Sequence, residues 1–197
     1  SMESIQQTFN GTADFGSSAS ATISRNGDLV YRMYLEHEVD VLGTDSNTEL
    51  GIVCDYGSHL MKEMELEIGG QRIDRHYGHW HSVYSQLTEF NPSKSQTTLF
   101  NRMCGNGESI ITDDADATNA AANLQRGWTE SGATTAMKGR FWIPLYFWFC
   151  RNPGLALPLI ALQYHEVKVK VTFEDLANLI VIDNTNDFSS GASGLLT

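Results

Sequence analysis

The stretch "FWIPLYFWFCRNPGLALPLIALQYHEV", residues 141–167, is the most apolar part of the chain, and it raises the choice between a membrane span and a packed core. From Phe141 to Leu162 its only charged residue is Arg151. A membrane helix needs about 20 mostly apolar residues, so the length alone would suffice. The prolines in the stretch argue against a helix because each removes a backbone donor, and a charge near mid-bilayer is costly. These prolines are Pro144, Pro153 and Pro158.

The same stretch predicts two buried strands around a turn. Asn152, Pro153 and Gly154 combine a fixed backbone angle with a permissive glycine, which is typical of a turn. The flanking segments 142–150 and 155–163 carry apolar side chains on both faces, as expected for strands packed on two sides.

Composition and charge narrow the functional classes. The 197 residues are 41% hydrophobic and 19% charged, which indicates a globular chain with a sizeable core. The net charge of −11 argues against direct nucleic-acid binding, because phosphate contacts need a basic patch. The three cysteines, Cys54, Cys104 and Cys150, lack a CxxC pair and favour a reducing compartment over a disulfide framework.

Several segments alternate with the period of a strand. Residues 28–39 alternate after Asn26-Gly27, which marks a turn or bulge, and Asp28 begins the segment. Residues 64–68 alternate before Gly69-Gly70, which predicts a tight hairpin. The cleanest alternation places Val167, Val169, Val171 and Phe173 on one face, and residues 179–182 predict a last short strand.

The period changes to that of a helix over residues 79–90. Trp80, Val83, Tyr84, Leu87 and Phe90 fall at helical spacing, so we expect one amphipathic helix that ends before Asn91-Pro92. Residues 92–140 form a long polar excursion, with a short helix expected over 115–126, and loops of this length are usually functional. The tail over residues 183–197 is polar and resembles a linker.

No constellation of residues predicts an active site or a cofactor. His76, His79 and His81 lie close enough in sequence for zinc, but His79 and His81 are i,i+2 neighbours that point to different faces of a helix, so we expect a helix start with one or two surface histidines. The run with Asp113, Asp114 and Asp116 lacks the glycine and glutamate of a calcium loop. Phosphate-binding and nucleophile-elbow motifs are absent, and we predict no enzyme activity, metal or cofactor.

Many short strands with one helix and long loops favour an all-β fold, an antiparallel sandwich or barrel. No repeat or clear boundary divides the chain, so we expect one domain over residues 1–182, with the excursion at 92–140.

Three segments together resemble the major capsid proteins of large icosahedral double-stranded DNA viruses of eukaryotes, the phycodnavirus, iridovirus and mimivirus group. They are "ISRNGDLVYRMYLEHEV", "EIGGQRIDRHYGHW" and "FWFCRNPGLALPLIALQYHEVKV", of which the last is the most specific. The resemblance implies a double jelly roll, of which this chain is similar to the first half, without its first strand and without the second jelly roll. The tail over 183–197 would then lead toward the second jelly roll.

The resemblance also implies a structural role. Three copies are expected to form a homotrimer with a pseudo-hexagonal outline, which then meets neighbouring capsomers and minor capsid proteins in a virion capsid assembled in the host cytoplasm. It implies neither direct nucleic-acid binding nor a transmembrane segment. The motif residues would shape turns and strand ends, and Arg151 would pair with a carboxylate or with carbonyls. The motif residues are Asn26, Gly27, Asp28, Gly69, Gly70, Asp74, His76, Tyr77, Arg151, Asn152, Pro153, Gly154, Pro158 and His165.

Two other functions share the jelly-roll architecture and remain open at this point. A carbohydrate-binding module would stack sugars on exposed aromatic residues such as Trp128. A cupin-type metalloenzyme would use strand histidines such as His37 and His165, although no cupin ligand pattern surrounds them.

Overall fold

The computed structural model describes residues 2–42, 48–53, 55–88, 99–104, 129–130 and 136–184. The chain forms two compact units, each built from three separate segments. The first unit, called the sheet unit below, comprises residues 1–35, 60–87 and 144–175, and the second unit comprises residues 36–59, 88–143 and 176–197. The single domain expected over residues 1–182 stays a prediction.

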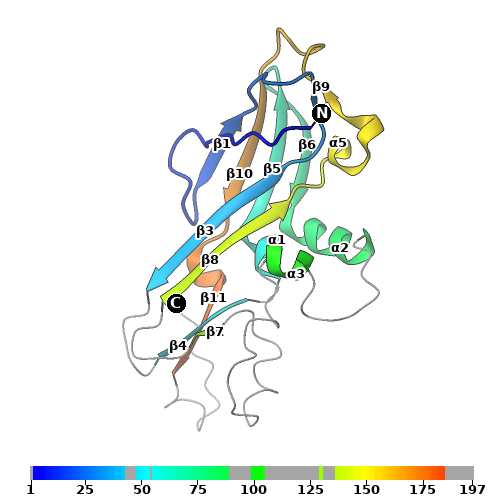
Figure 1. Ribbon diagram of the computed structural model, residues 1–197. Coiled ribbons are helices and arrows are strands. Elements are labelled where there is room, and N and C mark those ends of the chain that lie inside the picture. Colours follow the sequence, from blue (N-terminus) through cyan, green and yellow to red (C-terminus); the bar gives the residue numbers. More distant parts are fainter. Residues whose placement is uncertain are drawn as a thin grey trace. The chain divides into compact units, whose positions relative to one another are not determined.

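An antiparallel four-stranded sheet forms the centre of the sheet unit (Figure 1). Its order is β1 (Ser18–Thr22), β10 (Val167–Phe173), β5 (Met61–Ile68) and β6 (Gln71–Tyr77). Strands distant in sequence are therefore neighbours in space, and the all-β class predicted from the sequence is confirmed.

The inner face of this sheet is an apolar layer made by β5 and β10. Val169 lies opposite Leu66 and Val171 opposite Met64, and none of the four is more than 3% exposed. Burying side chains of this size stabilises the fold by about 1.5–3 kcal/mol each. The alternation predicted for residues 167–173 is confirmed.

The outer face of the sheet carries a ladder of opposite charges. Glu65 on β5 accepts a hydrogen bond from Arg72 at 2.9 Å, and its carboxylate also lies 3.7 Å from Arg75 and 4.0 Å from Lys170. Glu63 pairs with Arg75 in the same row. These cations cover Glu65, which is only 9% exposed although it points away from the core.

A tight hairpin joins β5 to β6. Gly69 and Gly70 have φ angles of 61° and 80°, the left-handed conformation that a two-residue type I′ turn requires at both positions. The predicted Gly-Gly hairpin is confirmed.

The two strands predicted over 142–150 and 155–163 are wrong for most of their length. Strand β8 (Ala136–Pro144) ends at Pro144, because proline has no N–H to extend a ladder. A short helix α5 (Trp148–Arg151) follows, then a 3-10 helix (Pro153–Leu155), and only Leu157–Pro158 pairs as strand β9. Pro153 fixes the first turn and the Asn152 side chain accepts a hydrogen bond from the Gly154 N–H, so this segment turns instead of extending.

The strand predicted over residues 28–39 is broken into two. Leu29–Val30 forms β2 and pairs with β9, whereas Tyr34–Leu42 forms β3 and pairs with β8. Alternation continues across the break, with Tyr31 and Met33 half-buried and Leu35 buried. Leu29 departs from this alternation, since it is 62% exposed.

The predicted helix is present as α2 (Gly78–Thr88), but it packs in an unexpected orientation. Its buried residues are Gly78, His81 and Ser85. Of the three histidines, for which the sequence predicted one or two surface positions, His79 is exposed, whereas His76 and His81 are only 7% and 1% exposed. The apolar residues Trp80, Val83 and Leu87 are on the exposed side.

The second unit contains short elements around a small aromatic core. Tyr56 in helix α1 (Tyr56–Leu60) is 2% exposed, and its ring centroid lies 5.3 Å from that of Phe141 on β8. The last predicted strand is confirmed as β11 (Ile180–Asn184), which pairs with β4 (Thr48–Ile52), and β4 pairs with β7 (Thr129–Glu130). Within the excursion, helix α3 (Leu99–Cys104) was not predicted, and the helix predicted over 115–126 lies outside the described residues.

We expect Gly57→Ala to destabilise the protein because α1 approaches α3 and β8 closely at this glycine. A Cβ at Gly57 would lie 2.8 Å from the Cys104 backbone oxygen and 3.0 Å from Ile143 Cγ1. The expected loss is about 1–3 kcal/mol of unfolding free energy, measured by urea denaturation. Gly27→Ala is the control because nothing lies within 4 Å of its added Cβ. Equal effects of the two substitutions would contradict the close approach.

Candidate assembly surface and its motif residues

Half of the motif residues gather at one end of the sheet unit, called the loop end. The bend at Asn26–Asp28 contacts the turn over 159–165 there, since the Asp28 carbonyl accepts a hydrogen bond from the Leu159 N–H at 2.9 Å. Pro158 lies opposite Leu29 in the β2–β9 pair. Gly27 does not have a positive φ, so the bend is not the type I′ turn that Asn-Gly favours.

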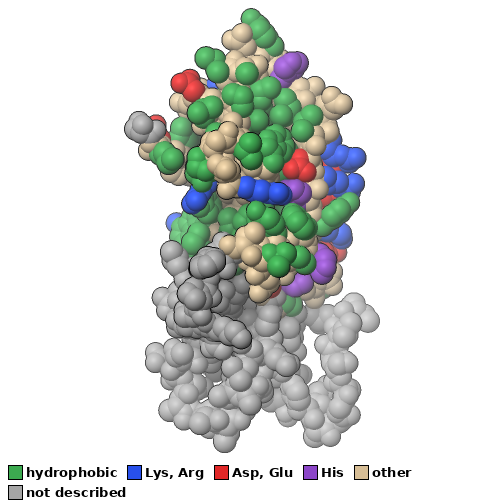
Figure 2. All heavy atoms as spheres, turned by 90° about the vertical axis from the view of Figure 1, so that its right-hand side faces the viewer, with side chains coloured by type: hydrophobic (Ala, Val, Ile, Leu, Met, Phe, Trp, Pro, Cys, Tyr) green, Lys and Arg blue, Asp and Glu red, His purple; other side chains and the backbone are tan. Residues whose placement is uncertain are grey.

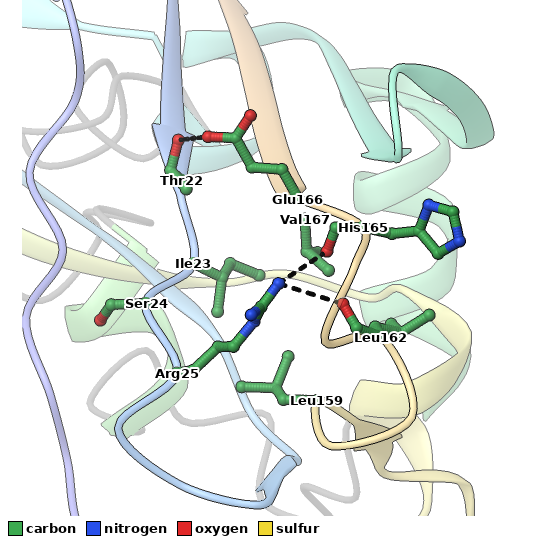
Figure 3. Close-up of a pocket in the computed structure, with 9 residues that line it drawn as sticks. All are labelled: Thr22, Ile23, Ser24, Arg25, Leu159, Leu162, His165, Glu166 and Val167. Carbon is green, nitrogen blue, oxygen red and sulfur yellow. Dashed lines mark hydrogen bonds between the residues drawn. The ribbon is translucent and has the colours of Figure 1, made fainter.

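Arg25 fixes the turn over 159–165 to the end of β1. Its Nη2 donates to the carbonyl oxygens of Leu162 at 3.2 Å and His165 at 3.4 Å (Figure 3). These atoms border a cavity of about 280 Å³, and Figure 3 shows the apolar side chains of Ile23, Leu159 and Leu162 around it. These carbonyls have no partner in a neighbouring strand, and Arg25 supplies a donor for them. The side chain of Arg25 therefore has a structural role at the edge of the cavity.

Gly69 and His165 meet at the same end. The Gly69 N–H donates to the Glu166 carbonyl at 2.8 Å, which joins the β5–β6 hairpin to the start of β10. A Cβ at Gly69 would lie 2.7 Å from His165 Nδ1, so the histidine ring packs over the glycine. The structure thus brings together two motifs that lie almost 100 residues apart in sequence.

The remaining motif residues lie around α5 and the end of β6. His76 Nε2 is 3.3 Å from Asp74 Oδ2, and the His76 ring stacks on Phe147 with centroids 5.2 Å apart. Burial lowers the pKa of His76, Arg151 lowers it further, and Asp74 opposes this shift. Neutral His76 is therefore the form that the packing favours.

Arg151 holds a carbonyl and an aromatic ring. Its Nε donates to the Tyr146 carbonyl at 3.1 Å, and its guanidinium lies 4.8 Å from the centroid of the Tyr84 ring. Asn152, Pro153 and Gly154 form the turn that follows. Tyr77 lies under the Arg75 guanidinium and is 49% exposed.

Sequence reasoning missed the structural roles of His81, which packs near α5, and of Arg25, which lies at the loop end. His81 Nε2 lies 2.8 Å from the Pro144 carbonyl oxygen, and its ring packs on Tyr146. A signal for His81 was present in the sequence. Gly78, His81 and Ser85 are spaced by three and four residues and so share one face of the helix, opposite the apolar face. For Arg25 no local pattern exists, because its carbonyl partners come from residues more than 130 positions away.

Several titratable groups in the described residues were candidates for a metal site or for chemistry. Searching that part of the chain finds no group of three or more His, Cys, Asp or Glu side chains placed to hold a metal ion. His37, a cupin candidate, lies 2.7 Å from the Tyr56 hydroxyl, and burial lowers its pKa to about 4. Burial raises the pKa of the Cys150 thiol to about 11, which leaves it unreactive as a nucleophile. Trp128, the candidate for sugar stacking, lies outside the described residues.

Across the part of the chain that the structure describes, no helix is both long and apolar enough to cross a membrane. The apolar stretch 141–167 is spread over short elements, and Leu155, Ile160 and Tyr164 within it are exposed.

Comparison with known proteins gives the class of this chain. Residues 1–195 match the family described as "Major capsid protein N-terminus". The major capsid protein of Pyramimonas orientalis virus is 46% identical over 180 residues, which cover 91% of this chain and 39% of that protein. The major capsid protein of Paramecium bursaria Chlorella virus 1 is 40% identical over 171 residues, which cover 87% of this chain and 32% of that protein.

Solved structures agree with these matches. A chain of the quasi-atomic model of the PBCV-1 virus capsid aligns with a TM-score of 0.58 at 33% identity, covering 98% of this chain and 38% of that chain. The Faustovirus major capsid protein aligns with a TM-score of 0.53 at 14% identity, which speaks to the fold alone. The chain belongs to the major capsid protein family of large double-stranded DNA viruses, in its N-terminal part. It spans less than two-fifths of the length of these relatives.

Acid is expected to destabilise the fold through its buried neutral histidines. The unfolded chain binds a proton at His37 near the ordinary pKa of 6.5, whereas the folded chain binds it only near 4. This contribution is fully present above pH 6.5 and is lost as pH falls toward 4, amounting to about 3 kcal/mol. Urea denaturation between pH 7 and pH 4 measures the slope. His37→Gln keeps a hydrogen-bonding end for Tyr56 without titrating, so its slope should be flatter. An unchanged slope would contradict a neutral buried His37.

Arg25→Ala is expected to loosen the turn over 159–165, because two carbonyls lose their shared donor. Hydrogen exchange at the Leu162 and His165 amides, which donate within this turn, should accelerate roughly tenfold. Arg32→Ala removes another exposed arginine, one that lies over Tyr31 instead of the turn, and serves as the control. Identical exchange in both variants would show that Arg25 does not fix the turn.

Proposed function

We propose that this chain is the N-terminal jelly-roll part of a structural capsid subunit. The observation that carries the proposal is the family match over residues 1–195, together with structural alignment over 98% of the chain to a protein in an assembled capsid. The antiparallel sheet of the sheet unit and its turn-forming motif residues support a jelly-roll sandwich.

The motif residues act as structural anchors in this proposal. Arg25, Gly69 and His165 shape the loop end of the sheet unit, and His76 and Arg151 hold the α5 segment. Their partners are backbone carbonyls, aromatic rings and a glycine, and such contacts stabilise the fold. Function then comes from surfaces repeated in a symmetric assembly.

The subunit we propose is a double jelly roll that forms a homotrimer with a pseudo-hexagonal outline. The trimers pack against neighbouring capsomers and minor capsid proteins in an icosahedral virion assembled in the host cytoplasm. A trimer of this kind would be held together by heterologous contacts that close into a ring.

A chimera tests the proposal. In it, this chain replaces the matching N-terminal region of the Pyramimonas orientalis virus major capsid protein, to which it is 46% identical. The chimera should have the same oligomeric mass as the parent protein in light scattering, and we expect that mass to be trimeric. A parent with its N-terminal region scrambled is the control. A soluble, folded chimera that stays monomeric while the parent is trimeric would refute the proposal.

A further inference from the structure

Helix α2 buries its polar side chains and exposes its apolar ones, the opposite of what is usual for a helix on the surface of a protein. Its buried stripe contains His81 and Ser85, which are 1% and 2% exposed. Its outward stripe contains Trp80, Val83 and Leu87, which are 39%, 39% and 77% exposed. A surface helix ordinarily turns its apolar stripe to the core and its polar stripe to solvent, so the outward stripe of α2 needs another explanation.

The buried polar stripe has its own partners, so this orientation is stable. His81 reaches the Pro144 carbonyl and packs against Tyr146, while the Ser85 hydroxyl donates to the Ser82 carbonyl at 2.8 Å. Rotating α2 to bury Trp80 and Leu87 would break the contacts of His81 with Pro144 and Tyr146, whereas the Ser85 hydrogen bond lies within the helix. The apolar stripe therefore faces outward because the sheet unit fixes the polar stripe inside.

The outward stripe continues into a wider apolar face, called the α2 face and made of Tyr77, Trp80, Val83, Tyr84 and Leu87. The Trp80 and Tyr84 rings are 5.4 Å apart, and the Arg151 guanidinium lies over Tyr84. Figure 2, which views the side of the molecule where α2 and α5 lie, shows hydrophobic side chains gathered with basic groups among them.

Arg151 gives the α2 face an electrostatic preference. Its described partners are a carbonyl and a ring, and within the described residues it forms no ion pair with a carboxylate. The chain itself has a net charge of −11, and the exposed side chains of Glu3 and Asp28 form no ion pair within the same ranges. A second copy of this chain therefore offers the carboxylates that Arg151 lacks.

We infer that the α2 face is a contact surface for a second copy of this chain, with Trp80 and Leu87 as apolar anchors and Arg151 as the charged anchor. This inference rests on the proposed capsid function and names a surface through which copies associate. Trp, Tyr and Arg are the residues enriched at the energetic centres of interfaces, and lysine and glutamate are depleted there. The five residues of the α2 face contain neither lysine nor glutamate.

The test measures self-association of this chain by sedimentation equilibrium at several protein and salt concentrations. Leu87→Ser should weaken association by about tenfold or more, because an exposed anchor is lost while the fold keeps its core. Arg151→Gln should weaken it less and should reduce its dependence on salt. Gln86→Ser, an exposed polar position on the same helix, is the matched control and should change association by less than about twofold.

A photocrosslinking amino acid at position 87 gives a second readout that does not depend on affinity. We expect covalent products of two or more copies, with the crosslink joining different molecules in mixtures of light and heavy isotope-labelled chain. A wild-type chain that stays monomeric, crosslinks confined to one copy, or equal effects of Leu87→Ser and Gln86→Ser would each overturn the inference. The capsid proposal would still stand if the chimera reached the parent's mass with Leu87→Ser in place, so the two failures are distinguishable.

Discussion

The pairing of β10 with β5 is the constraint on which the sheet unit depends. This pairing brings together residues about 100 positions apart and buries Val169 and Val171 against Leu66 and Met64. With β10 in an inner position, β1 adds on one side, and the β5–β6 hairpin extends the sheet on the other. Non-local pairing of this kind costs loop-closure entropy, which the buried aliphatic layer offsets.

The positions of both groups of motif residues follow from the strand registers of this sheet. His165 and Glu166 immediately precede β10, so its register sets them beside the Gly69 turn. His76 lies near the end of β6 opposite Met64, and this places its ring on Phe147. The β10–β5 register thus sets the contacts at the loop end, and the β5–β6 register sets the contact of His76 with Phe147.

Polar groups stabilise this fold mainly by satisfying backbone atoms. Arg25 and Arg151 engage carbonyl oxygens outside the strands, and His81 engages the carbonyl oxygen of Pro144, the last residue of β8. Unpaired buried carbonyls are costly, so a chain with many irregular turns needs such side chains. The same requirement orients α2 with its polar stripe inside, and an apolar surface remains for contacts between copies.

The sequence alone is enough to predict the period-two strands, the Gly69-Gly70 hairpin and the position of α2 along the chain, because these depend on local side-chain patterns. It also carried the family resemblance, through the motifs around Asn26, Gly69 and Arg151. It did not determine that residues 145–163 turn instead of extending, since the Asn152 cap and the turn contacts of Arg25 compete with strand formation there. The tertiary structure alone decided which side of α2 is buried, because partners for His81 come from Pro144 and Tyr146, 63 and 65 residues further along the chain.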